Sequence, residues 1–308
     1  MTEPEDLVIV GGGAAAMSAA IYGYRSGMDV TIVADSYGGQ ITDTDTVENY
    51  LGIKSISGPD LADRFKEHMR EYDVNEVTGQ KATSVTKKNG IFTVELEDGT
   101  ELEAYSVIVA TGGHRRKLGI PGEEEFLNKG VAYCSVCDGP LYQGDEVAVI
   151  GGGYAGTEAA VYMSDIAEKV YLFSRSGNLT GEHVTIEKLK EADNVEVLRG
   201  ATTKKFYGDQ LLEGVEYEQD GETRRLEVPG AFIEIGTVPN SDICDQCEKN
   251  DSGYIKANTE RETSVEGLYA AGDVTDKGVQ QLSVSAGQGT QAALNASEYV
   301  KDRKSSSE

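Results

Sequence analysis

The stretch LVIVGGGAAAMSAA, residues 7–20, carries the strongest structural signal in this sequence, since an apolar run leads into a glycine-rich turn and then into small residues. The same order returns 140 residues later as VAVIGGGYAGTEAA, residues 147–160. Further along, DVTIVADS (29–36) and KVYLFSRS (169–176) keep the same offset. Each copy predicts a strand, a tight turn, a helix and a second strand, which is how a dinucleotide-binding fold begins.

The small residues of each copy have separate mechanical roles. The first glycine is expected to allow the tight turn, and the third to let the backbone approach a pyrophosphate. Ala16 and Gly156 are expected to let the helix pack close to the strand, and the helix N-terminus offers N–H groups to phosphate. The predicted phosphate-binding residues are Gly11, Gly13, Ala14 and Ala15 in the first copy, and Gly151, Gly153, Ala155 and Gly156 in the second.

The end of the second strand of each copy is expected to read the ribose. Asp35 stands there in the first copy, where an acid suits the free hydroxyls of FAD or NAD. Arg175, between Ser174 and Ser176, stands there in the second, where a cation suits the 2′-phosphate of NADPH. The alternatives are a solvated loop acid and an ordinary surface charge.

These elements predict an α/β fold with two Rossmann-like domains, the second inserted into the first. We expect a discontinuous FAD-binding domain at 1–117 and 245–308, around an NAD(P)H-binding domain at 118–244. Antiparallel hairpins are predicted for FTVELEDGTELEAY (92–105) and LEGVEYEQDGETRRLEV (212–228), each turning at Asp-Gly.

The charge is strongly acidic, with 53 Asp and Glu against 28 Lys and Arg, a formal −25. Such a surface repels nucleic acid and anionic lipid. The acids are spread over the whole chain, which favours adaptation to molar salt over a merely acidic enzyme. The start of the chain is acidic rather than a secretory signal, and no apolar run approaches membrane-spanning length, so we expect a cytoplasmic protein.

Two of the four cysteines lie in VAYCSVCDGP, residues 131–140, as Cys134 and Cys137. Such a CxxC either binds a metal or cycles between dithiol and disulfide. The second pair, Cys244 and Cys247, follows 110 residues later, whereas zinc-ribbon pairs are about 15–20 residues apart. Joint zinc binding is therefore disfavoured, and no metal site is predicted. The second pair is left open as spare thiols, a small disulfide or a peripheral metal site.

In the order of its motifs, the chain resembles the low-molecular-weight thioredoxin reductases from end to end. The motifs that carry the resemblance are VIVGGGAAA, GGQITDTDTVENY, ATGGHRRKLGIPGE, GVAYCSVCDGP, VIGGGYAGTEAA, IGTVPN and GLYAAGDV. The CxxC followed by Asp, just before the second glycine-rich turn, is the most specific of them. The acidity further suggests a haloarchaeal member.

The resemblance implies FAD in the outer domain, a pyridine nucleotide in the inner one, thioredoxin or a thioredoxin-like protein as partner, and a homodimer. It implies that Cys137 faces the flavin, that Cys134 attacks the disulfide of the partner, and that Asp138 is the acid–base for the thiols. It implies flavin-binding roles for Gly39, Gln40, Asn49, Asp273 and Gln281. Two glycines at strand ends, Gly112 and Gly272, are also predicted to bind a cofactor.

One departure leaves the electron donor open. Relatives that use NADPH carry a basic run after the second strand of the inner domain, and here Arg175 alone remains of it. Three hypotheses follow: an NADPH-dependent disulfide reductase, the same flavin–dithiol enzyme supplied by reduced ferredoxin, and a nucleotide-binding redox sensor without turnover. We do not expect an alkyl hydroperoxide reductase flavoprotein, because these residues include no counterpart of the extra N-terminal redox domain of that family.

Overall fold

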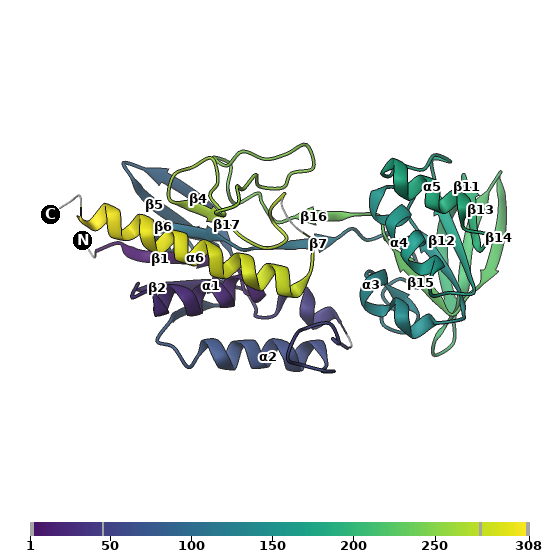
Figure 1. Cartoon of the computed structure of the whole chain (residues 1–308), viewed down its shortest axis with the longest axis horizontal. Helices are drawn as coiled ribbons and strands as arrows, with labels where there is room; N and C mark the ends of the chain where they lie inside the picture. The colour runs from purple at the N-terminus through teal and green to yellow at the C-terminus, as the bar shows by residue number, and fades with distance from the viewer. Residues whose placement is uncertain (1–2, 45, 277–278, 306–308) are drawn as a thin grey trace. The chain divides into compact units, whose positions relative to one another are not determined.

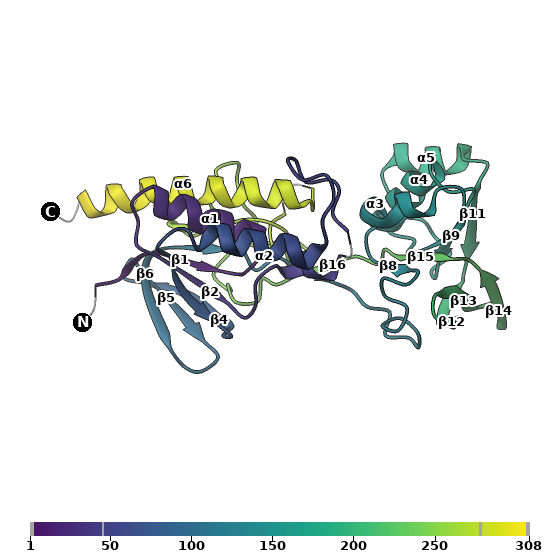
Figure 2. The same cartoon turned by 90° about the horizontal axis from the view of Figure 1, so that it is seen from below.

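The computed structural model describes residues 3–44, 46–276 and 279–305, and these fall into two units (Figures 1 and 2). Unit 1 comprises residues 1–114 and 238–308, and unit 2 comprises residues 115–237. The chain leaves unit 1 along β7 (Gly113–Arg115) and returns along β16 (Thr237–Pro239), and these two strands pair with each other. The second unit is thus an insertion into the first.

Within the described residues, unit 1 is built on a seven-stranded sheet in the order β3-β2-β1-β6-β5-β4, with β17 also paired to β6. The pairs β1–β2, β2–β3, β1–β6 and β6–β17 are parallel, and β4–β5 and β5–β6 are antiparallel. The strands are β1 (Glu5–Val10), β2 (Val30–Ala34), β3 (Asn75–Thr78), β4 (Ala82–Lys88), β5 (Ile91–Leu96), β6 (Glu101–Val109) and β17 (Leu268–Ala270).

Both faces of this sheet are covered by other elements, which explains why β1 is apolar on both sides. Leu7 and Ile9 belong to a core cluster with the alanines of α1 (Ala14–Arg25) and α6 (Leu282–Ser305). Val8 and Val10 face a second cluster, which includes both cysteines of the 244–247 pair. Both views show α6 running along α1 (Figures 1 and 2). The remaining helical segments of unit 1 are α2 (Gly58–Met69) and the short η1 (Gly39–Asp43).

Unit 2, all of whose residues are described, contains a five-stranded parallel sheet and a three-stranded antiparallel one. The parallel sheet has the order β11-β10-β9-β15-β8, with β8 (Val131–Ala132), β9 (Glu146–Ile150), β10 (Lys169–Ser174), β11 (Val195–Arg199) and β15 (Gly230–Ile233). The antiparallel sheet joins β12 (Thr202–Gly208), β13 (Leu212–Gln219) and β14 (Glu222–Glu227). The helical segments are α3 (Ser135–Asp138), η2 (Gly139–Tyr142), α4 (Tyr154–Ser164) and α5 (His183–Glu191).

The α/β fold class predicted from the sequence is confirmed. Each glycine-rich copy forms strand, turn and helix, as β1–α1 and β9–α4. The two predicted hairpins are β5–β6 and β13–β14. Asp220 and Gly221 both have positive φ, 55° and 80°, as a tight two-residue hairpin turn requires. No helix in the described ranges has both the length and the apolar character needed to cross a membrane.

Candidate active site

The predicted redox pair lies at the carboxyl end of β8. Cys134 and Cys137 form a disulfide with their Cα atoms 5.3 Å apart, across the short helix α3. The Cys137 N–H donates a hydrogen bond of 3.2 Å to Cys134 Sγ. Both cysteines are half-buried, and Val136 between them is 46% exposed. The disulfide is therefore held in a compact, partly exposed turn of unit 2.

Asp138, the predicted acid–base residue, is half-buried at the end of α3. Its N–H donates to the Cys134 carbonyl, which closes the turn around the disulfide. The ring of Tyr142 lies nearby, and its pKa is raised by burial and, to a lesser degree, by the charges of Asp138 and Asp145. Asp138 thus belongs to the disulfide turn. Its role in proton transfer stays a prediction.

One buried carboxyl at this turn was not predicted. Glu234, which directly follows β15, is 7% exposed, and its side chain accepts the Ser135 N–H at 3.0 Å. Burial raises the pKa of Glu234, and the hydrogen bond from Ser135 and the charge of Arg115 only partly offset that effect. The signal in the sequence is an acid inside the apolar run AFIEIG, which is an unusual place for an unpaired carboxylate.

The glycine-rich turns have the backbone geometry that phosphate binding requires. Gly11 and Gly151 have φ of +133° and +146°, and a Cβ at either would collide with the carbonyl of a neighbouring strand end. In contrast, a Cβ at Gly13 or Gly153 would meet nothing within 4 Å. These two glycines cap α1 and α4 without any side-chain hydrogen bond, so the first N–H groups of both helices are open to a ligand.

The predicted alanines stand at the start of these helices. Ala14 and Ala15 form the first turn of α1 and are buried, and Ala155 is half-buried in the first turn of α4. A Cβ at Gly156 would lie 1.9 Å from the Gly151 carbonyl oxygen, so α4 can approach its strand only with glycine there.

The two positions predicted to read a ribose carry opposite charges, and a second cation lies at the turn of the one in unit 2. Asp35 follows β2 and lies 3.4 Å from Lys81, with both side chains more than half exposed. Arg175 follows β10 and is exposed. Arg199, which was not predicted, pairs in register with Ser174 and donates to the Gly177 carbonyl oxygen. Sequence reasoning missed Arg199 because only the pairing of β10 with β11 brings it to this turn.

Four of the residues that the resemblance places near a flavin contact one another in unit 1 as two pairs. Gln40 donates to the Gly113 carbonyl oxygen at 3.0 Å and to Asp273 at 3.4 Å. Asp273 also accepts the Ser285 hydroxyl at 3.1 Å. Asn49 donates to Gln281 at 3.3 Å. Gly39, Gly112 and Gly272 all have positive φ, 56°, 64° and 78°, at the turns that bring these side chains together.

This arrangement fits a dinucleotide such as FAD. The open space at Gly13 adjoins the uncapped start of α1, where a pyrophosphate finds N–H donors. Gly272 and Asp273 line a small pocket, together with residues at the start of α6. Polar side chains and N–H donors are thus present at both positions.

Within the described residues no group of three or more His, Cys, Asp or Glu side chains could hold a metal ion. All four cysteines form disulfides, and the second joins Cys244 to Cys247. These two residues are 0% and 6% exposed within the core of unit 1. Of the alternatives left open for this pair, the structure therefore has the small disulfide.

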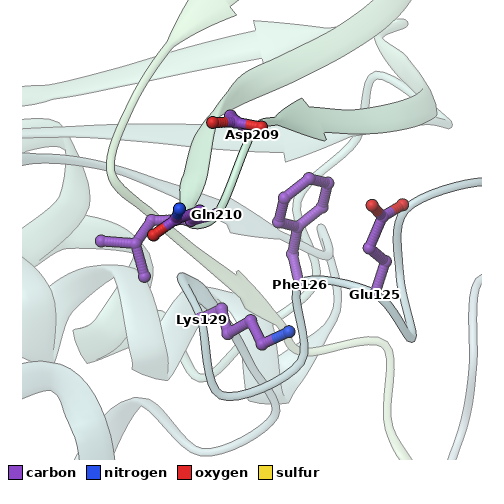
Figure 3. A pocket seen from close by; sticks show the side chains of 6 residues that line it. Glu125, Phe126, Lys129, Asp209 and Gln210 are labelled. Carbon is purple, nitrogen blue, oxygen red and sulfur yellow. The ribbon is translucent and has the colours of Figure 1, made fainter.

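A separate pocket in unit 2, of about 590 Å³, contains none of the predicted site residues. Its lining residues are Glu125, Phe126, Lys129, Asp209, Gln210 and Leu211 (Figure 3). The charged side chains that line it are of both signs.

Comparison with known proteins decides the family. The family model described as pyridine nucleotide-disulphide oxidoreductase matches residues 5–289. The chain belongs to this family. Membership accounts for the two glycine-rich turns and implies FAD and a nicotinamide dinucleotide as cofactors. It also makes the protein an oxidoreductase, as the redox interpretation of the CxxC predicts.

Relatives of this chain have different names. The chain is 42% identical over 301 residues to a Bacillus subtilis protein named NADH dehydrogenase and to a component of the alkyl hydroperoxide reductase of Staphylococcus aureus. Each match covers 97% of this chain but only 59% of the relative. The chain thus spans about three fifths of the length of these curated relatives.

Solved structures match over nearly the full length of both chains. Thioredoxin reductase from Streptococcus pyogenes has a TM-score of 0.90 and 31% identity, with 97% of this chain and 98% of that chain covered. Thioredoxin reductase from Giardia duodenalis also has a TM-score of 0.90, with 29% identity and coverage of 97% and 100%. A ferredoxin-flavin thioredoxin reductase from Clostridium acetobutylicum has a TM-score of 0.55, 28% identity and coverage of 98% and 99%.

Proposed function

We propose that the chain is an FAD-containing reductase that passes electrons from NADPH to thioredoxin or a thioredoxin-like protein. The observation that carries this proposal is the half-buried Cys134–Cys137 disulfide in a surface turn of unit 2. The same unit has a glycine-rich turn with an uncapped helix start, which suits a pyridine nucleotide. The similarity to solved thioredoxin reductases supports the choice of substrate.

The chemistry of the chain is thiol–disulfide exchange. Bound FAD and nicotinamide would supply the two electrons that convert the disulfide to a dithiol. In the dithiol, the Cys137 N–H next to Cys134 Sγ favours the thiolate of Cys134. This thiolate attacks one sulfur of the partner's disulfide, so that a mixed disulfide forms and one partner thiolate leaves.

The second exchange step returns the turn to its starting state. Cys137 attacks Cys134 Sγ, the mixed disulfide breaks, and the second partner thiolate leaves. The two protons lost by Cys134 and Cys137 end on the two partner thiols, and we assign their transfer to Asp138. The Cα separation of 5.3 Å lies in the usual range for a disulfide, so the turn needs no large rearrangement between the two states.

Exposed apolar side chains beside the disulfide support a protein substrate. Val136 is 46% exposed between the cysteines, and Leu141, four residues after Cys137, is 75% exposed. Large exposed apolar side chains next to a reactive group are typical of a surface that a partner covers. A small molecular oxidant would gain nothing from them.

The choice of NADPH as donor rests on Arg175 and Arg199, which lie at the ends of the second and third strands of the glycine-rich repeat in unit 2. We infer that a 2′-phosphate at the end of β10 would bind to one or both of these cations. Ferredoxin is the alternative donor, favoured by the missing basic run and by the similarity to the Clostridium acetobutylicum enzyme.

A second candidate function comes from the relatives that are components of alkyl hydroperoxide reductase. The 42% identity to them reopens a class that the sequence alone disfavoured. In that case the Cys134–Cys137 dithiol would reduce a disulfide on another domain or another protein of such a system rather than free thioredoxin. The predicted haloarchaeal origin, homodimer and cytoplasmic location belong to the main proposal and do not depend on the electron path.

The deciding experiment is anaerobic titration of the flavin-loaded protein with NADPH, NADH and reduced ferredoxin, followed by turnover with thioredoxin. We expect NADPH to bleach the flavin and thioredoxin to be reduced catalytically. Bleaching by ferredoxin alone would select the other donor. Bleaching without turnover on any disulfide substrate would favour a redox sensor and refute the proposed enzyme.

A further inference from the structure

Glu234 occupies an unusual position for a carboxyl group. It directly follows the fully buried strand β15, and its side chain is 7% exposed. Its N–H donates to the Ile150 carbonyl oxygen at 2.8 Å, so its backbone is fixed to the end of β9. A Cβ at Gly151 would lie 2.1 Å from the Glu234 carbonyl oxygen, so the glycine-rich turn also packs directly against it.

From this fixed position the side chain contacts the redox turn. The carboxylate accepts the Ser135 N–H at 3.0 Å, and Ser135 is the residue directly after Cys134. Ser135 is itself 4% exposed, so this N–H has no access to bulk water as an alternative acceptor. The peptide between Cys134 and Ser135 is therefore anchored to the parallel sheet by one hydrogen bond.

The charges around Glu234 do not by themselves explain a buried carboxylate. Arg115, on β7, interacts favourably with it, and Glu158, on α4, interacts unfavourably. The desolvation of the carboxyl is the largest influence on its pKa. A buried carboxyl that is only partly compensated costs free energy, and an apolar side chain at the end of an apolar strand would avoid that cost.

We propose that Glu234 is a positioning residue of the redox centre, which holds the backbone between Cys134 and Cys137 in the conformation that lets the disulfide close. The disulfide of this structure is the state in which the hydrogen bond is formed. Without the acceptor, the dithiol turn samples more conformations, so the two sulfurs meet less often. The equilibrium then shifts towards the dithiol, and the disulfide becomes easier to reduce.

This inference adds a residue to the proposed function but is tested without it. The protein is equilibrated with glutathione redox buffers, its thiols are trapped by alkylation, and the peptide with Cys134 and Cys137 is quantified apart from that with Cys244 and Cys247. Neither a nucleotide nor thioredoxin takes part. A failure of the proposed electron path would therefore leave this measurement intact.

Three variants separate the acceptor from the charge. Glu234→Leu removes both, and we expect an approximately tenfold shift of the thiol–disulfide equilibrium towards the dithiol, about 30 mV for a two-electron couple. Glu234→Gln keeps an acceptor oxygen, and its equilibrium should stay within about threefold of the wild type. Glu158→Gln removes a nearby exposed charge that makes no bond to the turn, and no shift is expected.

Glu234→Ala, which also lacks the acceptor, is measured in parallel, so that the result does not depend on one variant folding. A merely structural role would lower the melting temperature of these variants and leave the equilibrium of the Cys134–Cys137 pair unchanged. Wild-type equilibria in folded Glu234→Leu and Glu234→Ala would overturn the proposal. So would Glu234→Gln behaving like Glu234→Leu, since the charge and not the acceptor would then be responsible.

Discussion

Arg199 lies directly opposite Ser174 in the parallel pairing of β10 and β11, and its guanidinium donates to the carbonyl oxygen of Gly177. The turn after β10 therefore has a second cation beside Arg175, which the order of residues along the chain does not reveal. Since the turn after this strand is where a nucleotide ribose is read in dinucleotide-binding folds, we infer that both arginines can bind a 2′-phosphate.

We expect Arg175→Ala and Arg199→Ala each to raise KM for NADPH about fivefold and to leave KM for NADH unchanged. An exposed ion pair contributes up to about 1 kcal/mol, which corresponds to that factor. Initial rates with both nucleotides, together with flavin content, measure the effect. Arg224→Ala, on β14, is the control for loss of a surface cation. An unchanged preference for NADPH in a variant with both substitutions, Arg175→Ala and Arg199→Ala, would show that other residues bind the 2′-phosphate.

Substitution of alanine for the third glycine of a turn should weaken the binding of one cofactor and leave the other bound. Gly13 and Gly153 have φ of −83° and −91° and free space for a Cβ, so both variants should fold. The added methyl group of Gly13→Ala occupies the space where a pyrophosphate would lie, and the purified protein should lose most of its FAD. Gly153→Ala should keep its FAD and bind the pyridine nucleotide at least about tenfold more weakly.

Flavin-to-protein absorbance ratios and nucleotide titrations test this pair. Each variant is the control for the other, because the two turns are equivalent in structure but belong to different units. Equal loss of FAD in both variants would contradict the assignment of FAD to unit 1. A wild-type protein that is colourless and binds no added FAD would refute it altogether.

Substitution of either redox cysteine should abolish turnover without affecting the reduction of the flavin by its donor. Cys134→Ser should abolish reduction of thioredoxin and leave the flavin reducible by its donor, because no thiol takes part in that first step. Cys137→Ser should also abolish turnover, since the mixed disulfide with Cys134 could no longer be resolved. Stopped-flow reduction of the flavin and thioredoxin turnover are measured on the same samples. Near-normal turnover in either variant would refute the assigned roles.

The second disulfide should be structural. Cys244 and Cys247 are 0% and 6% exposed among the valines of the unit 1 core, so a reductant cannot reach them in the folded protein. Mild reduction followed by alkylation should label Cys134 and Cys137 alone. Cys244→Ala with Cys247→Ala should cost about 2 kcal/mol in the free energy of unfolding, as the loop-entropy relation gives for so short a loop. Labelling of all four cysteines under native conditions would contradict this.

The parts that could be predicted from the sequence are those set by local geometry. A positive φ at Gly11 and the Asp220–Gly221 turn follow from residue types next to each other in the chain. The alternation of Leu7 and Ile9 with Val8 and Val10 between two core clusters follows from an apolar run in a sheet that is covered on both faces.

The parts that could not be predicted depend on contacts between distant residues. Ser135 and Glu234 are 99 residues apart, and Arg199 reaches Gly177 across a strand pairing whose register no motif records. The burial of Cys244 is equally hidden, because its segment SDICDQCEKN is mostly polar and reads as a surface loop. Resemblance named Gln40 and Asp273, but only the structure brings their side chains within 3.4 Å of each other.

The acidic surface leads to a prediction that can be tied to one pair of residues. Glu95 and Glu101 lie directly opposite each other on β5 and β6, and both are exposed. Like charges in such a cross-strand pair destabilise a sheet, and the formal charge of −25 extends this repulsion over the whole molecule. Molar salt shortens the Debye length to about 3 Å and screens the repulsion, whereas at about 0.1 M it is about 10 Å.

We therefore expect the free energy of unfolding to fall steadily as KCl is diluted from molar concentration to about 0.1 M. Glu101→Gln removes one charge of the repelling pair, so it should gain up to about 0.5 kcal/mol at low salt and nothing at high salt. Glu222→Gln is the matched control, because this exposed acid lies 3.3 Å from Arg224 and its loss removes an attraction instead. Urea unfolding at each salt concentration measures all three proteins. Stability that does not change with salt, or an equal gain from both substitutions, would show that carboxylate repulsion is not what limits this fold at low ionic strength.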